Sequence, residues 1–259
     1  MLEQVLLFLA GYLGKRIVNL GDLIAKALYY VIVPALILHE VPGHEINTQI
    51  PYFILPFVVS LPLVALVYFW KKDPLWIMGV GMINSGFVLP FYLEKYPSPP
   101  MLSAILGTMA LHYIVIYGLV VGKDGWKKVL SQPILWAYVI ALLNPALPAW
   151  LDNVLAIIGS LTGPLTMVML GMFFEFRLGK EMASVLALRM IGGLLLGWAY
   201  GSLMGFDQAG MALARALGGA PTGYTSLIYA SLLKLDTEKM AQAVSLGTLL
   251  GFLWVPLWL

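Results

Sequence analysis

Ten long apolar stretches divide the chain, and this pattern restricts its fold more than any other feature. They lie roughly at residues 3–18, 23–42, 51–70, 74–96, 101–122, 133–149, 152–174, 182–205, 208–233 and 237–258. A helix needs about 20 apolar residues to span a bilayer. Charged residues make up only 11% of the chain, against about 25% in soluble domains. The sequence therefore predicts an all-α, polytopic membrane protein with ten transmembrane helices.

Positive charge is concentrated in alternate loops, which predicts an orientation. Twelve of the 15 basic residues share these loops: Lys15, Arg16, Lys26, Lys71, Lys72, Lys123, Lys127, Lys128, Arg177, Lys180, Lys234 and Lys239. Only Lys95 lies in the remaining loops. Because loops rich in Lys and Arg stay cytoplasmic, we expect a cell-membrane protein with both termini extracytoplasmic. Lys15 and Arg16 lie at the end of the first stretch instead of preceding it, which favours an uncleaved span.

Several function classes are disfavoured by composition. The spans leave room for short loops only, so we expect no separate catalytic domain and no enzyme. The chain has no cysteine, which excludes disulfides and thiolate metal sites. The net charge of +2 reflects the basic loops and does not indicate nucleic-acid binding. The segment from His39 to His44 is similar to a zinc protease motif, but its histidines are five residues apart across Pro42-Gly43, so we expect no metal site.

Two spans contain residues that break helices near their midpoints. Span 4 contains Asn84-Ser85-Gly86 followed by Pro90, and span 9 contains Gly218-Gly219-Ala220-Pro221-Thr222-Gly223. Proline removes a backbone donor and glycine is a poor helix former, so we expect both helices to be interrupted. Lipid cannot satisfy broken backbone, which is tolerated only where protein or a water-filled cavity surrounds it.

The two breaks occupy the fourth position in each half of the chain. Residues 1–128 and 129–259 each hold five spans, and an odd number per half makes the second half inverted relative to the first. Internal matches between Val33-Pro34 and Gly163-Pro164, and between Gly107-Thr108 and Gly247-Thr248, favour such repeats, although their offsets differ by ten residues. Inverted repeats with interrupted helices are typical of secondary transporters, in which the interruptions mark the substrate site. The alternative is a pair of incidental kinks.

Five segments together resemble the auxin efflux carrier family, a relative of the bile-acid symporters. They are Gly11-Tyr12-Leu13 before Lys15-Arg16, Val33-Pro34-Ala35-Leu36-Ile37, Asn84-Ser85-Gly86-Phe87-Val88-Leu89-Pro90, Ala220-Pro221-Thr222-Gly223, and Leu246-Gly247-Thr248-Leu249-Leu250. The resemblance implies a scaffold lobe from spans 1, 2, 6 and 7 and a transport lobe from spans 3–5 and 8–10. It also implies that spans 4 and 9 cross at their breaks, that the substrates are organic anions, and that scaffold helices form a homodimer.

The breaks supply the predicted substrate-binding residues. The amide of Asn84 can donate and accept hydrogen bonds, either to a carboxylate or to freed backbone groups. Pro221 and Thr222 would begin the second half of span 9, where the free amides of a helix N-terminus suit an anion, and Pro90 would do the same in span 4. Ser85 and Ser226 complete the polar set.

Two arginines lie within the spans, and both are candidate binding or gating charges. An arginine at bilayer depth needs a partner, a cavity or an escape to the interface. Each side chain either faces a cavity or partly escapes by snorkelling, and Arg215 is the stronger candidate because it lies six residues before Pro221.

No cofactor is expected, and coupling to sodium or protons stays open because no Asp or Glu lies deep in a span. His112 is the titratable group at depth, although a packed, hydrogen-bonded histidine is the commoner reading. One face of span 10, with Gln242, Ser245 and Thr248, offers oxygen ligands for sodium, although small polar residues also join helices structurally.

The leading hypothesis is a secondary carrier that moves a small organic anion by alternating access. The alternatives are a cation–proton antiporter, a sodium-coupled symporter of the same fold group, and a receptor that binds without transporting. An antiporter generally needs a deep carboxylate, which the spans lack.

Overall fold

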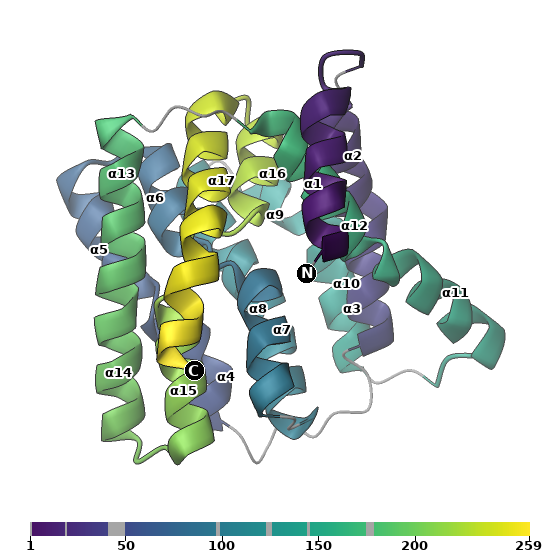
Figure 1. Cartoon of the computed structure of the whole chain (residues 1–259). Coiled ribbons are helices and arrows are strands. Elements are labelled where there is room, and N and C mark those ends of the chain that lie inside the picture. Colours follow the sequence, from purple (N-terminus) through teal and green to yellow (C-terminus); the bar gives the residue numbers. More distant parts are fainter. Residues whose placement is uncertain are drawn as a thin grey trace.

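The computed structural model describes residues 2–18, 20–40, 50–96, 99–122, 126–143, 146–174 and 179–259, which form helices and no strands (Figure 1). The first part of the chain comprises α1 (Leu2–Gly14), α2 (Gly21–Ala27), the π-helical turn η1 (Leu28–Ile32), α3 (Val33–Glu40), α4 (Ile50–Val58), α5 (Leu61–Trp70), α6 (Pro74–Gly81), α7 (Ser85–Lys95) and α8 (Pro99–Val121).

The remaining elements are α9 (Trp126–Leu130), α10 (Pro133–Leu142), α11 (Ala149–Ser160), α12 (Thr162–Phe173), α13 (Lys180–Ala187), the π-helical turn η4 (Leu188–Gly192), α14 (Gly193–Leu203), α15 (Gln208–Gly218), α16 (Thr225–Leu232), α17 (Thr237–Trp254) and the 3-10 turn η5 (Val255–Trp258). The predicted all-α class is confirmed. The segment from His39 to His44 lies outside the described residues beyond Glu40.

Within the described ranges, five continuous helical segments are long and apolar enough to cross a membrane: Gly21–Glu40, Ile50–Trp70, Ala149–Phe173, Lys180–Leu203 and Thr237–Trp258. Each joins two or more consecutive helical elements. They make the chain a multi-pass membrane protein. The count of ten spans and the inverted repeat stay predictions.

Acidic caps begin three of the helices. The Asp73 carboxylate accepts hydrogen bonds from the amides of Leu75 and Trp76, at 2.7 and 3.4 Å. Asp207 and Asp236 cap α15 and α17 in the same way. A carboxylate at this position satisfies amides that have no partner within the helix and complements its positive end.

Small residues allow two helix pairs to pack backbone against backbone. At Gly171 in α12 an added Cβ would collide with the Phe8 carbonyl of α1, and at Gly218 in α15 it would collide with the Gly193 carbonyl at the start of α14. Such close packing is typical of helices in membranes. α3 packs against α10 and α11, so α1–α3 and α10–α12 form one group of contacting helices.

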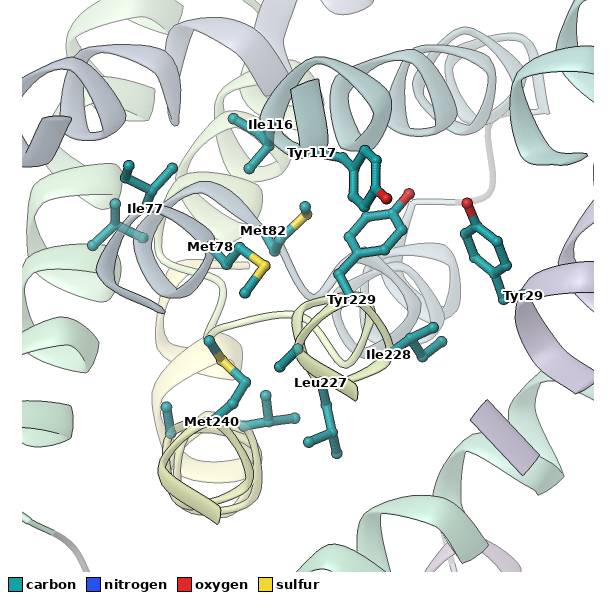
Figure 2. Packing of buried hydrophobic residues seen from close by; sticks show 14 of the residues in the cluster. Tyr29, Ile77, Met78, Met82, Ile116, Tyr117, Leu227, Ile228, Tyr229 and Met240 are labelled. Atoms are coloured by element: carbon teal, nitrogen blue, oxygen red, sulfur yellow. The ribbon is translucent and has the colours of Figure 1, made fainter. Parts of the chain in front are cut away.

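A buried aromatic and methionine cluster joins helices far apart in sequence (Figure 2). The Tyr229 ring lies 4.7 Å from the Tyr117 ring and 5.8 Å from the Tyr29 ring, measured between centroids. Met78 and Met82 belong to the same cluster. These contacts bring α16 against α8 and η1, beside the end of α6.

The connections at one end of the molecule are the basic ones. The turn after α1, the α5–α6 connection and the start of α13 lie at the top of Figure 1, whereas the start of α4 and the α14–α15 turn lie at the bottom. Lys95 donates a hydrogen bond to the carbonyl oxygen of Leu259 at 2.8 Å, so the end of α7 and the C-terminal residue are neighbours.

Candidate substrate-binding site

Both expected helix breaks are present, and they pair with each other. The first leaves residues 82–84 between α6 and α7, and the second leaves residues 219–224 between α15 and α16. The backbone N–H of Asn84 donates to the Pro221 carbonyl at 3.0 Å, and the backbone N–H of Gly223 donates to the Met82 carbonyl at 2.8 Å. These bonds form an isolated antiparallel bridge between Ile83 and Thr222. The two breaks thereby satisfy part of the backbone that each exposes.

The positions of the prolines differ from the prediction. The first break precedes Ser85, and Pro90 lies inside α7, where its side chain is outside the described part of the structure. Pro221 and Thr222 do not begin a helix, because α16 starts at Thr225. They form the extended, paired segment instead, so the amide of Gly223 is occupied rather than open.

Two predicted hydroxyl ligands make backbone contacts. The fully buried Thr222 hydroxyl donates to the Gly79 carbonyl at 2.8 Å, next to the end of α6. The Ser226 hydroxyl donates to the Gly223 carbonyl at 2.6 Å and closes the turn into α16. Both side chains therefore hold the break together.

The side chain of Arg189 contacts residues beside both helix breaks, a position that the sequence did not predict. It does not snorkel to the interface, because its side chain is fully buried. Its guanidinium donates five hydrogen bonds of 2.9–3.3 Å, to the carbonyl oxygens of Val59, Val80, Leu217, Gly218 and Ala220. Glycine and proline patterns in the sequence locate the breaks but give no sign of this partner.

A cavity of about 330 Å³ lies beside the first break. Its wall comes from α3, α10, α11 and α12 on one side, and from α7, α8 and the second break on the other: Val33, Leu36, Ile37, Glu40, Asn84, Ser85, Gly86, Phe87, Met109, Tyr113, Ile134, Gly159, Thr162, Gly163, Thr166, Met167 and Tyr224. Most of this wall is apolar, with amide and hydroxyl groups gathered near Asn84.

Asn84 lies at the N-cap position of α7, with its side chain 3% exposed. That side chain does not cap the helix. Instead, its Nδ2 donates to the Thr248 hydroxyl of α17 at 3.3 Å, and this hydroxyl donates to the Val244 carbonyl at 2.7 Å. The structure thus brings together two residues that the sequence assigned to different roles.

Tyr113 of α8 fixes the start of α7 from another side. Its hydroxyl donates to the Ile83 carbonyl at 2.8 Å and lies 3.2 Å from the Ser85 hydroxyl. Sequence reasoning missed this residue because a tyrosine in an apolar helix gives no signal of which neighbour it meets.

Threonines of α12 form the opposite wall. The hydroxyls of Thr162 and Thr166 are both buried, and neither has a hydrogen-bond partner among the described residues. A buried hydroxyl without a partner costs free energy, so it is a natural contact for a ligand. The four-residue spacing of these threonines, which puts both on one helix face, was the available signal.

The described cavity wall does not carry the positive charge expected of an anion-binding site. Glu40 is the one charged residue in its described wall, and no basic side chain lines it. Arg215 does not reach it, since its Nε donates to the Met211 carbonyl of its own helix at 3.3 Å. The positive end of α7, with Ser85 and Gly86 in the wall, is the favourable feature for a carboxylate there.

The remaining coupling candidates lie apart from Asn84. His112 is fully buried, with its Nε2 2.6 Å from the Ser60 hydroxyl. Gln242 accepts a hydrogen bond from the Gly179 amide at 3.3 Å, near the start of α17. The predicted face of span 10 consists of Gln242, Ser245 and Thr248. Among the described side-chain hydrogen bonds of this face, only that of Thr248 reaches the first helix break.

Comparison with known proteins gives one family. The model for the family described as membrane transport protein matches residues 116–259, which is more than half of the chain. No curated protein matches the chain significantly.

Proposed function

Since the chain belongs to the membrane transport protein family, we propose that it is a secondary carrier that moves a small organic acid across the cell membrane by alternating access. The observation that carries this proposal is the placement of the cavity. It lies against a pair of mutually hydrogen-bonded helix breaks and between two groups of helices. Interrupted helices of this kind form the substrate sites of many secondary transporters.

The proposal includes ten spans in two inverted halves, 1–128 and 129–259. The group of α1–α3 and α10–α12 corresponds to the scaffold lobe, and α4–α8 with α13–α17 to the transport lobe. The cavity wall draws on both groups, so a shift of one against the other would open it to alternate sides.

The substrate is a small organic acid with an apolar body. A carboxylate near Ser85 and Gly86 would lie at the positive end of α7, with hydrogen bonds from Asn84 and Thr162. The apolar wall suits a hydrocarbon or aromatic body, and about 330 Å³ is near the lower limit of small-molecule pockets. With Glu40 in the wall and no basic side chain, we expect an acid with a single carboxylate rather than a di- or tricarboxylate.

Dimerisation through the scaffold helices and extracytoplasmic termini complete the proposal. The α11 helix directs Trp150, Val154 and Ile157 outward, which suits either lipid or a second copy. The mass of the protein in detergent, measured by light scattering, tests the dimer.

Flux of radiolabelled monocarboxylic acids into proteoliposomes tests the carrier, with sodium and pH gradients imposed separately. A carrier equilibrates its substrate across the bilayer, whereas a receptor only binds it. Thr162→Val should weaken transport of the best substrate. Ser160→Ala is the matched control, because that exposed hydroxyl donates to Ile157 and lies outside the cavity wall. Binding without flux would contradict the proposal.

A further inference from the structure

Every donor of the Arg189 side chain is used. A guanidinium has five N–H groups and cannot lose its proton in proteins. Its Nε donates once, to Ala220, while Nη1 and Nη2 donate twice each. Arg189 therefore has no donor left for an anion in the cavity.

The oxygens around the guanidinium come from the C-terminal ends of three helices. Val59 follows the last residue of α4, Val80 lies in the last turn of α6, and the other three acceptors close α15. Each helix C-terminus carries roughly half a negative charge. These partial charges can balance the arginine without a carboxylate, and among the described residues Arg189 forms no ion pair with one.

A buried cage of backbone carbonyls is a cation site in chemical terms. Selectivity filters of potassium channels use such oxygens to replace the hydration shell of an ion. Here the carbonyl cage joins the α4–α5 turn, α6 and α15. A positive charge within the cage is needed because the partial negative charges of the three helix C-termini would otherwise repel one another. The cation is supplied by the chain itself.

We propose that Arg189 is a tethered cation that occupies a carbonyl cage at the junction of α4, α6 and α15. The native protein then needs no dissolved cation at this place. A variant without the side chain keeps the cage and binds a free cation of matching shape, for which the guanidinium ion is the probe.

Thermal unfolding of purified Arg189→Gly in detergent, with guanidinium chloride or choline chloride at ~10 mM, tests the inference far below denaturing concentrations. In choline we expect the variant to unfold well below the native protein. Guanidinium should raise its midpoint by about 5 °C or more, because a ligand that binds only the folded state stabilises it. The native midpoint should be equal in both salts.

Two further variants make the result decisive. Arg189→Met keeps an unbranched side chain of similar length without charge, and we expect it to be as unstable as the glycine variant in choline. Arg215→Gly removes an arginine outside the cage, so guanidinium should not restore any stability that it loses. If Arg189→Gly cannot be purified in choline, its yield with and without guanidinium becomes the measurement. Equal behaviour in the two salts, or native stability of Arg189→Met, would overturn the proposal.

Discussion

The amide of Gly223 donates a hydrogen bond to the carbonyl oxygen of Met82 at 2.8 Å, and this bond ties the second helix break to the first. The contact requires close approach of two backbones. A Cβ added to Gly223 would lie 2.6 Å from the Ile83 carbonyl oxygen, a distance at which one of the two segments must move.

Gly223→Ala should therefore destabilise the protein by about 1–3 kcal/mol, the usual cost of overpacking. The thermal midpoint in detergent measures this. Gly14→Ala serves as the control, since a Cβ there meets open space. An unchanged midpoint for Gly223→Ala would mean that the paired segment is looser than the structure indicates.

Asn84→Ala should weaken substrate affinity by about 1–3 kcal/mol, because it removes a buried amide from the cavity wall. That range is roughly 5- to 150-fold in the dissociation constant. Lys95→Gln, at the opposite end of α7 from the break, is the control. Parental affinity of Asn84→Ala across a panel of acids would place the site elsewhere.

Arg215→Gln should leave substrate affinity unchanged, although the sequence pattern made Arg215 a candidate for anion binding. Its side chain bonds to its own helix and does not line the cavity. Transport assays on correctly inserted protein decide the matter. A loss of affinity would show that Arg215 reaches the substrate in another conformation of the transport cycle.

Tyr113→Phe should lower stability by about 1–2 kcal/mol, because it leaves the Ile83 carbonyl without its tyrosine donor. Thermal unfolding measures the loss. Tyr68→Phe changes a half-exposed tyrosine of α5 and should cost little. An equal loss of stability in Tyr113→Phe and Tyr68→Phe would show that the hydrogen bond from Tyr113 to Ile83 does not stabilise the protein.

A reporter fused after Leu259 should be extracytoplasmic, because the basic loops predict that orientation. The bond from Lys95 to the Leu259 carbonyl places the end of α7 on the same side. A second reporter inserted at Lys72 should be cytoplasmic. If the two report the reverse, the orientation is wrong but the fold is not affected.

The sequence locates the breaks well because glycine and proline act on their own backbone. The runs at 84–86 and 218–223 cost helical stability wherever they occur, and helices end beside both. Pro90 shows the limit of this reasoning, since it continues α7 instead of ending it. Neighbouring groups in a packed membrane protein can satisfy the backbone that a proline frees.

The partners of the breaks could not be predicted, because they depend on contacts between distant segments. Arg189 and Tyr113 come from spans other than the broken ones, and only the assembled structure brings them to residues 80–83 and 217–220. Thr162 was missed for the same reason. Gln242 and Thr248 lie on the same helix, α17, but they contact different neighbours: Gln242 contacts the Gly179 amide, and Thr248 contacts the Asn84 side chain.

The bridge between Ile83 and Thr222 also sets an order of events during synthesis. The ribosome synthesises the first break before the second, at roughly 5–20 residues per second. The Met82 carbonyl is therefore without its donor, the Gly223 amide, for on the order of ten seconds. Lipid offers no substitute partner in that interval. The nascent segment around residues 82–84 should therefore stay beside the insertion machinery or water until Gly223 has been synthesised, and a chain truncated before residue 221 should be retained there and degraded.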